Sequence, residues 1–130
     1  MHSAKTIFIV NCNAISTNYS QPVIEALVGL GYSTKIFNYS DFQDSILQFV
    51  PDFIIAYLPG NKNLDLQYCH SLVKSIEVPI FVISSLDDVE SRIQAFNIGI
   101  EDYLVSPVSP KVIAVRVRNI LNCRFRSLVM

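Results

Sequence analysis

Cysteine and histidine, the residue types that most often bind metals, are few in this chain and widely spaced. The cysteines are Cys12, Cys69 and Cys123, with no CxxC spacing, and the histidines, His2 and His70, join no metal-ligand pattern. A structural zinc site needs four such ligands at close spacing. The sequence therefore predicts no metal site. An odd number of thiols indicates reduced cysteines in a cytoplasmic protein, which is the location we expect.

The carboxylates offer little for catalysis. Asp65, Asp87 and Asp88 stand where helices are expected to begin, and an aspartate there caps the free N–H groups of the first turn. Asp52 lies at the amino end of an expected strand. No nucleophile stands beside a base, and Pro59-Gly60-Asn61 is typical of a turn, not of a phosphate loop. We expect no enzymatic activity.

The composition fits one domain with a well-filled core. The chain has 130 residues, of which 51% are hydrophobic and 16% charged, and this balance argues against disorder. A net charge of −1 gives no indication of binding to nucleic acid or to a membrane surface. The longest apolar runs have the length of strands, so we expect no transmembrane segment. We expect one domain over residues 1–122 and a tail, or the start of a linker, over 123–130.

Five short apolar runs alternate with helical patterns. Runs that lack polar alternation fit strands covered on both faces, as in a parallel sheet. Right-handed crossovers between them predict an α/β fold, a doubly wound (βα)5 sheet of five parallel strands. The expected strands are residues 6–10, 33–37, 53–58, 80–84 and 103–105.

Several residues mark the ends of the expected helices. Ser40 to Gln43 and Asp87 to Glu90 are capping-box patterns. Gly99 ends the fourth helix, and Ser109-Pro110 opens the last one. The first helix either begins near Ser20 or is kinked at the proline two residues later.

Three segments resemble the receiver domains of response regulators: residues 51–58, 78–84 and 99–110. The last is similar to the family's Gly-x-Asp-Asp-Tyr-x-x-Lys-Pro segment, and residues 114–121 resemble the final helix of its winged-helix transcription-regulator subfamily. The resemblance covers about residues 5–122. It implies a flavodoxin-like, receiver-like fold, a cis Ser106–Pro107 bond, and a role in two-component signalling and transcription regulation.

The resemblance breaks at the phosphorylation site. The family holds Mg²⁺ with two acids after the first strand, phosphorylates an aspartate that ends the third, and binds the phosphate with a hydroxyl and a lysine. Here those positions hold Asn11 and Cys12, Tyr57, Ser84 and Ser106, and only Ser84 matches. Mg²⁺ prefers carboxylate oxygens, and a tyrosine forms no acyl phosphate. We expect an atypical, phosphorylation-independent pseudo-receiver that binds no Mg²⁺ and no other cofactor, with the Tyr57 ring filling the emptied pocket.

Two signalling features of the family remain. Ser84 and Tyr103 match its switch pair, in which the aromatic ring turns inward upon activation, and we expect this pair to be fixed in one state. The subfamily dimerises through its fourth helix, fifth strand and last helix. By position, that face comprises Arg92, Ile93, Phe96, Glu101, Asp102, Ala114, Arg116 and Arg118.

Within this face we expect an apolar centre with charged pairs around it. Ile93, Phe96 and Ala114 form the centre, and the pairs Asp102–Arg116 and Glu101–Arg118 cross a two-fold axis. Arg92 lacks its usual glutamate partner, because Val112 occupies that position. A solvated helix face stays the alternative explanation for the two arginines of the last helix.

Two functions fit these residues. The leading one is a signalling module that dimerises, or docks a protein partner, through this face and regulates a fused transcription-factor output domain, without direct nucleic-acid or membrane contact. The alternative is a sensor of a small molecule, because the emptied pocket is polar and uncharged and lies at the carboxyl ends of the strands. Its expected lining is Asn11, Cys12, Tyr57, Ser84 and Ser106. A redox role for Cys12 also stays open.

Overall fold

Short runs of β-branched and aromatic residues form the strands, as the sequence pattern predicts. The computed structural model describes residues 4–12 and 20–129, and the side chains of these residues as far as Cys123. The strands are β1 (Thr6–Asn11), β2 (Ser33–Asn38), β3 (Phe53–Tyr57), β4 (Ile80–Ser84) and β5 (Asp102–Val105). The helices are α1 (Gln21–Gly29), α2 (Tyr39–Gln48), α3 (Lys62–Ser75), α4 (Val89–Ile98) and α5 (Pro110–Val129).

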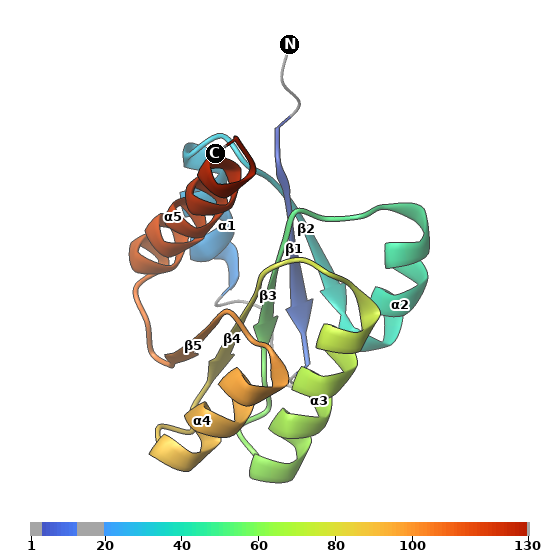
Figure 1. Cartoon of the computed structure of the whole chain (residues 1–130), viewed down its shortest axis with the longest axis vertical. Coiled ribbons are helices and arrows are strands. Elements are labelled where there is room, and N and C mark those ends of the chain that lie inside the picture. The colour runs from blue at the N-terminus through green and yellow to red at the C-terminus, as the bar shows by residue number, and fades with distance from the viewer. Residues whose placement is uncertain (1–3, 13–19, 130) are drawn as a thin grey trace.

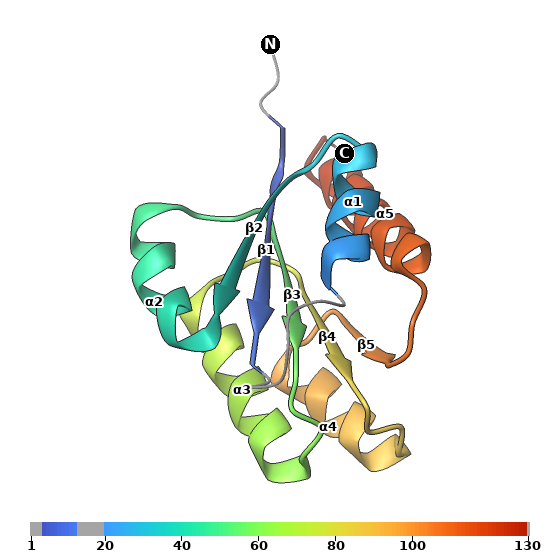
Figure 2. The same cartoon turned by 180° about the vertical axis from the view of Figure 1, so that it is seen from behind.

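All strand pairs are parallel, and the strand order is β2-β1-β3-β4-β5. Helices α1 and α5 cover one face of the sheet, and α2, α3 and α4 cover the other (Figures 1 and 2). Every residue of β3 and β4 is buried, because helices exclude water from both faces. The predicted doubly wound, flavodoxin-like fold is confirmed.

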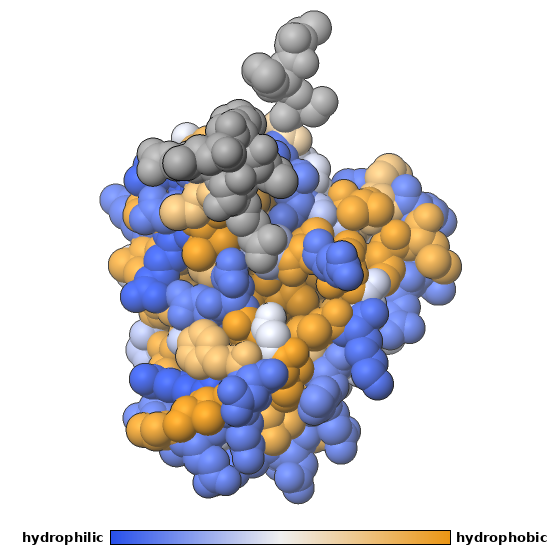
Figure 3. All heavy atoms as spheres, viewed as in Figure 1, coloured by the Kyte–Doolittle hydropathy of each residue, from blue (hydrophilic) through white to orange (hydrophobic). Residues whose placement is uncertain are grey.

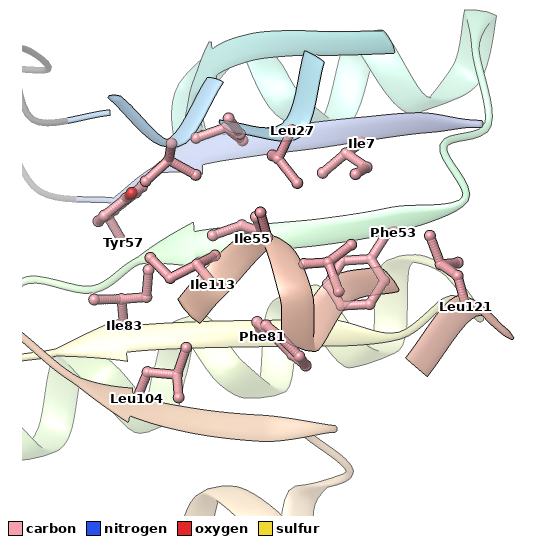
Figure 4. Packing of buried hydrophobic residues seen from close by; sticks show 14 residues of the cluster. Ile7, Leu27, Phe53, Ile55, Tyr57, Phe81, Ile83, Leu104, Ile113 and Leu121 are labelled. Atoms are coloured by element: carbon pink, nitrogen blue, oxygen red, sulfur yellow. The ribbon is translucent and has the colours of Figure 1, made fainter. Parts of the chain in front are cut away.

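The sheet separates two apolar layers. On the α1–α5 side, the α5 stripe of Ile113, Val117 and Leu121 packs against the strands, as its helical spacing predicts. Phe53 and Phe81 meet edge to face below it, with ring centroids 4.7 Å apart (Figure 4). Such a pair contributes about 0.5–1.5 kcal/mol beyond the burial of its area. This ring contact joins β3 and β4 within the layer that α5 covers.

The helix ends agree with the sequence in part. Ser20 is the N-cap of α1, so the helix begins there and is not kinked, and Gly99 ends α4 with a φ of 122°. The capping box expected from Ser40 is wrong, because α2 begins at Tyr39 without a side-chain cap. The α4 cap is Asp88 and not the preceding aspartate.

The last helix begins at Pro110, as predicted, and continues to Val129. The segment expected as a tail or linker is therefore largely helical as far as the structure describes it. The Ser106–Pro107 bond is cis, as the resemblance implies. Of the helices described, none combines the length and the apolar character that crossing a membrane requires.

Candidate functional site

The five residues predicted as one site lie along the carboxyl edge of the sheet. Asn11 pairs in register with Tyr57, and the N–H of Cys12 donates to the Tyr57 carbonyl at 2.9 Å. The N–H of Ser106 donates to the Ser84 carbonyl, also at 2.9 Å. Parallel strands end at the same edge, so residues far apart in sequence meet there.

A half-open cavity of about 460 Å³ lies at this edge, on the side of α1 and α5. Tyr57, Ser84 and Ser106 line it, whereas Asn11 and Cys12 are not among its lining residues. The prediction of one pocket lined by all five is therefore wrong. Cys12 packs in the apolar layer on the opposite face of the sheet from Tyr57, because successive strand residues point to opposite faces.

Tyr57 forms part of the cavity wall. Its side chain is only 7% exposed and belongs to the apolar cluster that joins β3 to α1 and α5. Figure 4 shows it at the carboxyl end of β3, near Ile83 of the neighbouring strand. The expectation that this ring fills the emptied pocket is too strong, since the cavity remains beside it.

The residues at this edge do not fit a Mg²⁺ ion. Burial, followed by the nearby Cys69 and Asp65, raises the pKa of the Cys12 thiol to about 12. A protonated, buried sulfur is a poor ligand for a hard cation. Among the described residues, no group of three histidine, cysteine or acidic side chains is placed to hold a metal. The same high pKa argues against a reactive redox thiol.

Asp65 is the residue of this edge that the sequence interpretation undervalued. It is only 4% exposed, and its Oδ1 accepts the backbone N–H groups of Gly60 and Asn61 at 2.9 and 3.2 Å. Its Oδ2 accepts the Ser84 hydroxyl at 2.7 Å. Capping at the start of α3 explains the hydrogen bonds of Oδ1 but not the bond of Oδ2 to Ser84. A signal was present in the sequence, because Asn61 already caps α3 and left Asp65 available for another contact.

Ser84 and Tyr103 are connected through one backbone residue. The Ser84 hydroxyl oxygen accepts the N–H of Leu86 at 3.1 Å, and the Tyr103 hydroxyl donates to the Leu86 carbonyl at 2.9 Å. Tyr103 is buried, and burial raises the pKa of its phenol, so the hydroxyl stays protonated and can donate. The predicted pair is therefore coupled through the β4–α4 loop.

The loops after β3 and β4 are also joined directly. The ammonium of Lys62 lies 3.6 Å from the carboxylate of Asp88. Gly60, at a φ of 83°, approaches so closely that an added Cβ would collide with the hydroxyl of Ser85. An ion pair that is largely exposed contributes little energy, and it is the positive φ of Gly60 that favours a glycine at this position.

The predicted dimer face is partly exposed and apolar. Ile93 and Phe96 of α4 are 53% and 46% exposed, and Val112 and Val115 of α5 are also exposed. Figure 3 shows apolar groups over α4 among hydrophilic ones. We define the α4–β5–α5 surface by Arg92, Ile93, Phe96, Asp102, Val112, Val115 and Arg116.

Three parts of the predicted face need correction. Ala114 is 2% exposed and packs in the core, so it cannot be the surface centre. Arg116 bonds Asp102 of the same chain at 2.7 Å, so the predicted pair across a dimer axis already has a partner within the chain. Burial raises the pKa of Tyr32 while the charge of Arg118 opposes that rise. Positions 116 and 118 are about 200° apart around a helix, so Arg116 and Arg118 point in different directions from α5.

Glu101 is half-buried next to β5. The predicted pair Glu101–Arg118 stays a prediction. A further exposed apolar area, which the sequence did not indicate, covers α2 and the segment after it (Figure 3). It contains Leu47, Phe49 and Val50, and the ammonium of Lys35 lies 3.9 Å from the centroid of the Phe49 ring.

Known regulators are similar to this sequence, although no family model matches it. The probable transcriptional regulator ycf27 of Porphyridium aerugineum is 42% identical over 71 residues, which are 55% of this chain and 30% of the regulator. The transcriptional regulatory protein BaeR of Escherichia coli is 28% identical over 107 residues, 78% of this chain and 42% of BaeR. The chain thus spans less than half the length of these relatives.

Solved structures share the fold. A two-component response regulator from Clostridium difficile has a TM-score of 0.78 at 20% identity, over 91% of this chain and 96% of that one. A CheY-like response regulator receiver domain from Methanospirillum hungatei has a TM-score of 0.80 at 16% identity, over 96% and 99%. The chain thus has the fold of response-regulator receiver domains, and part of its sequence is similar to transcriptional regulators such as ycf27 and BaeR.

Proposed function

We propose that this receiver domain works without phosphorylation, as a cytoplasmic signalling module that regulates a fused transcription-factor output domain by binding. The observation that supports this most directly is Tyr57. It is a buried phenol that ends β3, in register with an uncharged Asn11. By resemblance, this position belongs to the phosphoacceptor aspartate. A phenol forms no acyl phosphate, so the domain needs another way to hold its active arrangement.

Phosphoryl transfer from a small donor tests whether the domain works without phosphorylation. We incubate the domain with acetyl phosphate and Mg²⁺ and measure its intact mass. The expected result is no phosphoryl adduct, because the edge offers neither an acceptor aspartate nor a carboxylate set for the metal. A stoichiometric adduct that is labile to hydroxylamine would identify an acyl phosphate and overturn the proposal.

The binding partner that we propose is a second copy of this domain, docked through the α4–β5–α5 surface. This surface combines exposed Ile93 and Phe96 with both signs of charge, Arg92 and the pair Asp102–Arg116. A two-fold dimer places the same surface on both subunits, so a surface carrying apolar and oppositely charged groups can complement itself.

Sedimentation velocity over a concentration series tests this surface, without a phosphodonor. We expect a concentration-dependent dimer, and we expect Arg116→Asp to weaken it at least tenfold by placing like charges together beside Asp102. The matched control is Lys111→Asp, which makes the same charge change on an exposed position of the same helix. A wild-type monomer at all concentrations, or equal effects of the two variants, would contradict the proposal.

A second candidate function, the sensing of a small neutral molecule, rests on the cavity of about 460 Å³. Its wall is largely apolar, and Ser84, Ser85 and Ser106 are among its lining residues. That volume lies within the range of ligand pockets. Thermal shift with a metabolite library tests it, with Ser106→Trp as the variant that fills the cavity. Absence of any hit, or a hit that Ser106→Trp does not abolish, would reject this function.

A further inference from the structure

Among the described residues, a series of hydrogen bonds, linked through the backbone of Leu86 and the side chain of Tyr103, runs from the start of α3 to the surface of α5. It begins where Asp65 accepts the N–H groups of the β3–α3 loop and ends where Arg116 donates to Asp102. Each neighbouring pair is within 3.2 Å. Its members, in order, are Gly60 and Asn61, Asp65, Ser84, Leu86, Tyr103, Asp102 and Arg116.

We propose that Asp65 is the positioning residue of this series: its carboxylate holds the Ser84 hydroxyl, and through it the β4–α4 loop and Tyr103, in one permanent arrangement. The hydroxyl hydrogen of Ser84 points at Asp65, so its oxygen is free to accept the Leu86 N–H. The Leu86 carbonyl is thereby fixed as the acceptor for Tyr103. Without the Asp65 carboxylate, the Ser84 hydroxyl loses the acceptor that fixes its orientation.

Asp65 suits this role because it is buried and both of its carboxylate oxygens accept hydrogen bonds. Three donors converge on its two oxygens, two from the β3–α3 loop and one from the end of β4, and it is 4% exposed. An acceptor with this many donors and so little water has one low-energy position. The carboxylate of Asp65 therefore orders this edge of the sheet, and no phosphoryl group from a donor molecule is needed to do so.

The far end of the series reaches the α4–β5–α5 surface. The Asp102 carboxylate accepts the N–H of Tyr103 at 2.9 Å through one oxygen and the Arg116 guanidinium at 2.7 Å through the other. Tyr103 makes this bond with its backbone N–H and the Leu86 bond with its hydroxyl, so a shift of the β5 backbone at Tyr103 would move the carboxylate that orients Arg116. The effect of Asp65 on assembly rests on the function proposed above, whereas its hold on the β4–α4 loop does not.

The test uses Asp65→Asn, which keeps the shape of the side chain but places N–H hydrogens opposite Ser84. Hydrogen exchange at individual amides is followed by NMR. We expect the Leu86 amide to exchange at least tenfold faster and the Tyr103 ring resonances to shift, while the buried Ile55 amide of β3 changes less. The control is Asp44→Asn, the same charge change on an exposed position of α2. Unchanged Leu86 exchange would overturn the proposal.

Ser84→Ala provides an independent variant, in case Asp65→Asn is poorly folded, and the double variant tests the route. If Asp65 acts through the Ser84 hydroxyl, Leu86 exchanges equally fast in both single variants and in the double variant. If the increases in the Leu86 exchange rate caused by the two single substitutions multiply in the double variant, Asp65 and Ser84 act on the loop independently, and the proposal is overturned.

Sedimentation velocity on the same samples separates the effect of Asp65 on the β4–α4 loop from its effect on self-association. We expect Asp65→Asn to weaken self-association at least threefold. A loosened loop with unchanged self-association would overturn the link to the surface. A monomeric wild type would reject the proposed dimer, and the exchange rate of the Leu86 amide would still decide whether Asp65 holds the β4–α4 loop.

Discussion

The two sides of the carboxyl edge are built from different interactions. On the α1–α5 side, Tyr57 and its neighbours form an apolar wall that leaves a cavity of about 460 Å³. On the α3–α4 side, Asp65, Ser84, Leu86 and Tyr103 are joined by short hydrogen bonds. Apolar contacts have no direction and tolerate vacant volume, whereas buried hydrogen bonds fix one geometry. We call the α1–α5 side, where apolar packing leaves a cavity, the permissive side. We call the α3–α4 side, where hydrogen bonds fix one geometry, the specified side.

The largest expected effect concerns the two thiols of the specified side. Burial raises the pKa of Cys12, from 9.0 for a free thiol to about 12, and that of Cys69 likewise. A raised pKa makes the reactive thiolate scarcer, by about a thousandfold near pH 8. Iodoacetamide should therefore label the exposed Cys123 in the folded protein and the other two only in urea. Equal labelling rates would show that this side is open.

Tyr57→Ala tests the permissive side. Loss of a buried aromatic ring lowers the free energy of unfolding by about 3 kcal/mol. Tyr57→Phe keeps the ring and should lose only about 1 kcal/mol. Urea unfolding measures both. Equal losses would mean that the hydroxyl group, and not ring packing, stabilises this wall.

Gly60→Ala tests how tightly the two loops of the specified side approach each other. A Cβ there meets the Ser85 hydroxyl at a φ of 83°, so we expect a loss of about 2 kcal/mol. Gly31→Ala is the matched control, because its φ is 93° but no atom lies within 4 Å of an added Cβ. The control should lose about 1 kcal/mol. Indistinguishable losses would show that strain alone, and not the close approach, accounts for the effect.

Tyr103→Phe removes the single hydrogen bond to the Leu86 carbonyl. The expected loss in the free energy of unfolding is about 1 kcal/mol, with faster amide exchange in the β4–α4 loop. Tyr68→Phe is the control, because no hydrogen bond of its hydroxyl occurs among the described residues. If the two variants behave alike, the Tyr103 bond contributes nothing to the specified side.

Arg116→Ala has the smallest expected effect on the isolated domain. Its ion pair with Asp102 is half-exposed on the arginine side, so its loss costs less than about 1 kcal/mol and less still in high salt. Arg92→Ala serves as the control, since Arg92 is exposed and makes no ion pair in the described part of the chain. A loss above about 2 kcal/mol would mean that this end of the hydrogen-bond series supports the fold.

The fold could be predicted because apolar runs and helix signals are local. The strand at residues 80–84 is found with its observed bounds, since burial on both faces leaves an unbroken apolar run. The pattern that begins at Ser40 misplaces the start of α2 because it matches a capping box, while Phe42 is the residue of that helix buried in the core. The helix starts at Tyr39, two residues before the start that a cap at Ser40 implies.

The site could be predicted only as far as the strand ends. Asp65 lies 19 positions from Ser84, and no local pattern connects a helix start with a distant strand end. The family position places Ala114 on the surface, but the helical spacing does not. Ala114 stands three residues before Val117 and seven before Leu121, and that spacing places it on the buried stripe.

The joining of the β3–α3 and β4–α4 loops has a consequence for recognition. The hydrogen bonds of Asp65 to Gly60, Asn61 and Ser84 already hold the two loops together in the free domain. Binding normally loses entropy when interface loops become ordered, about 0.5–1.5 kcal/mol for each flexible side chain that is immobilised. Here that ordering is complete before any encounter. The domain therefore behaves as a preorganised template, and we expect its free and bound structures to differ little in these loops.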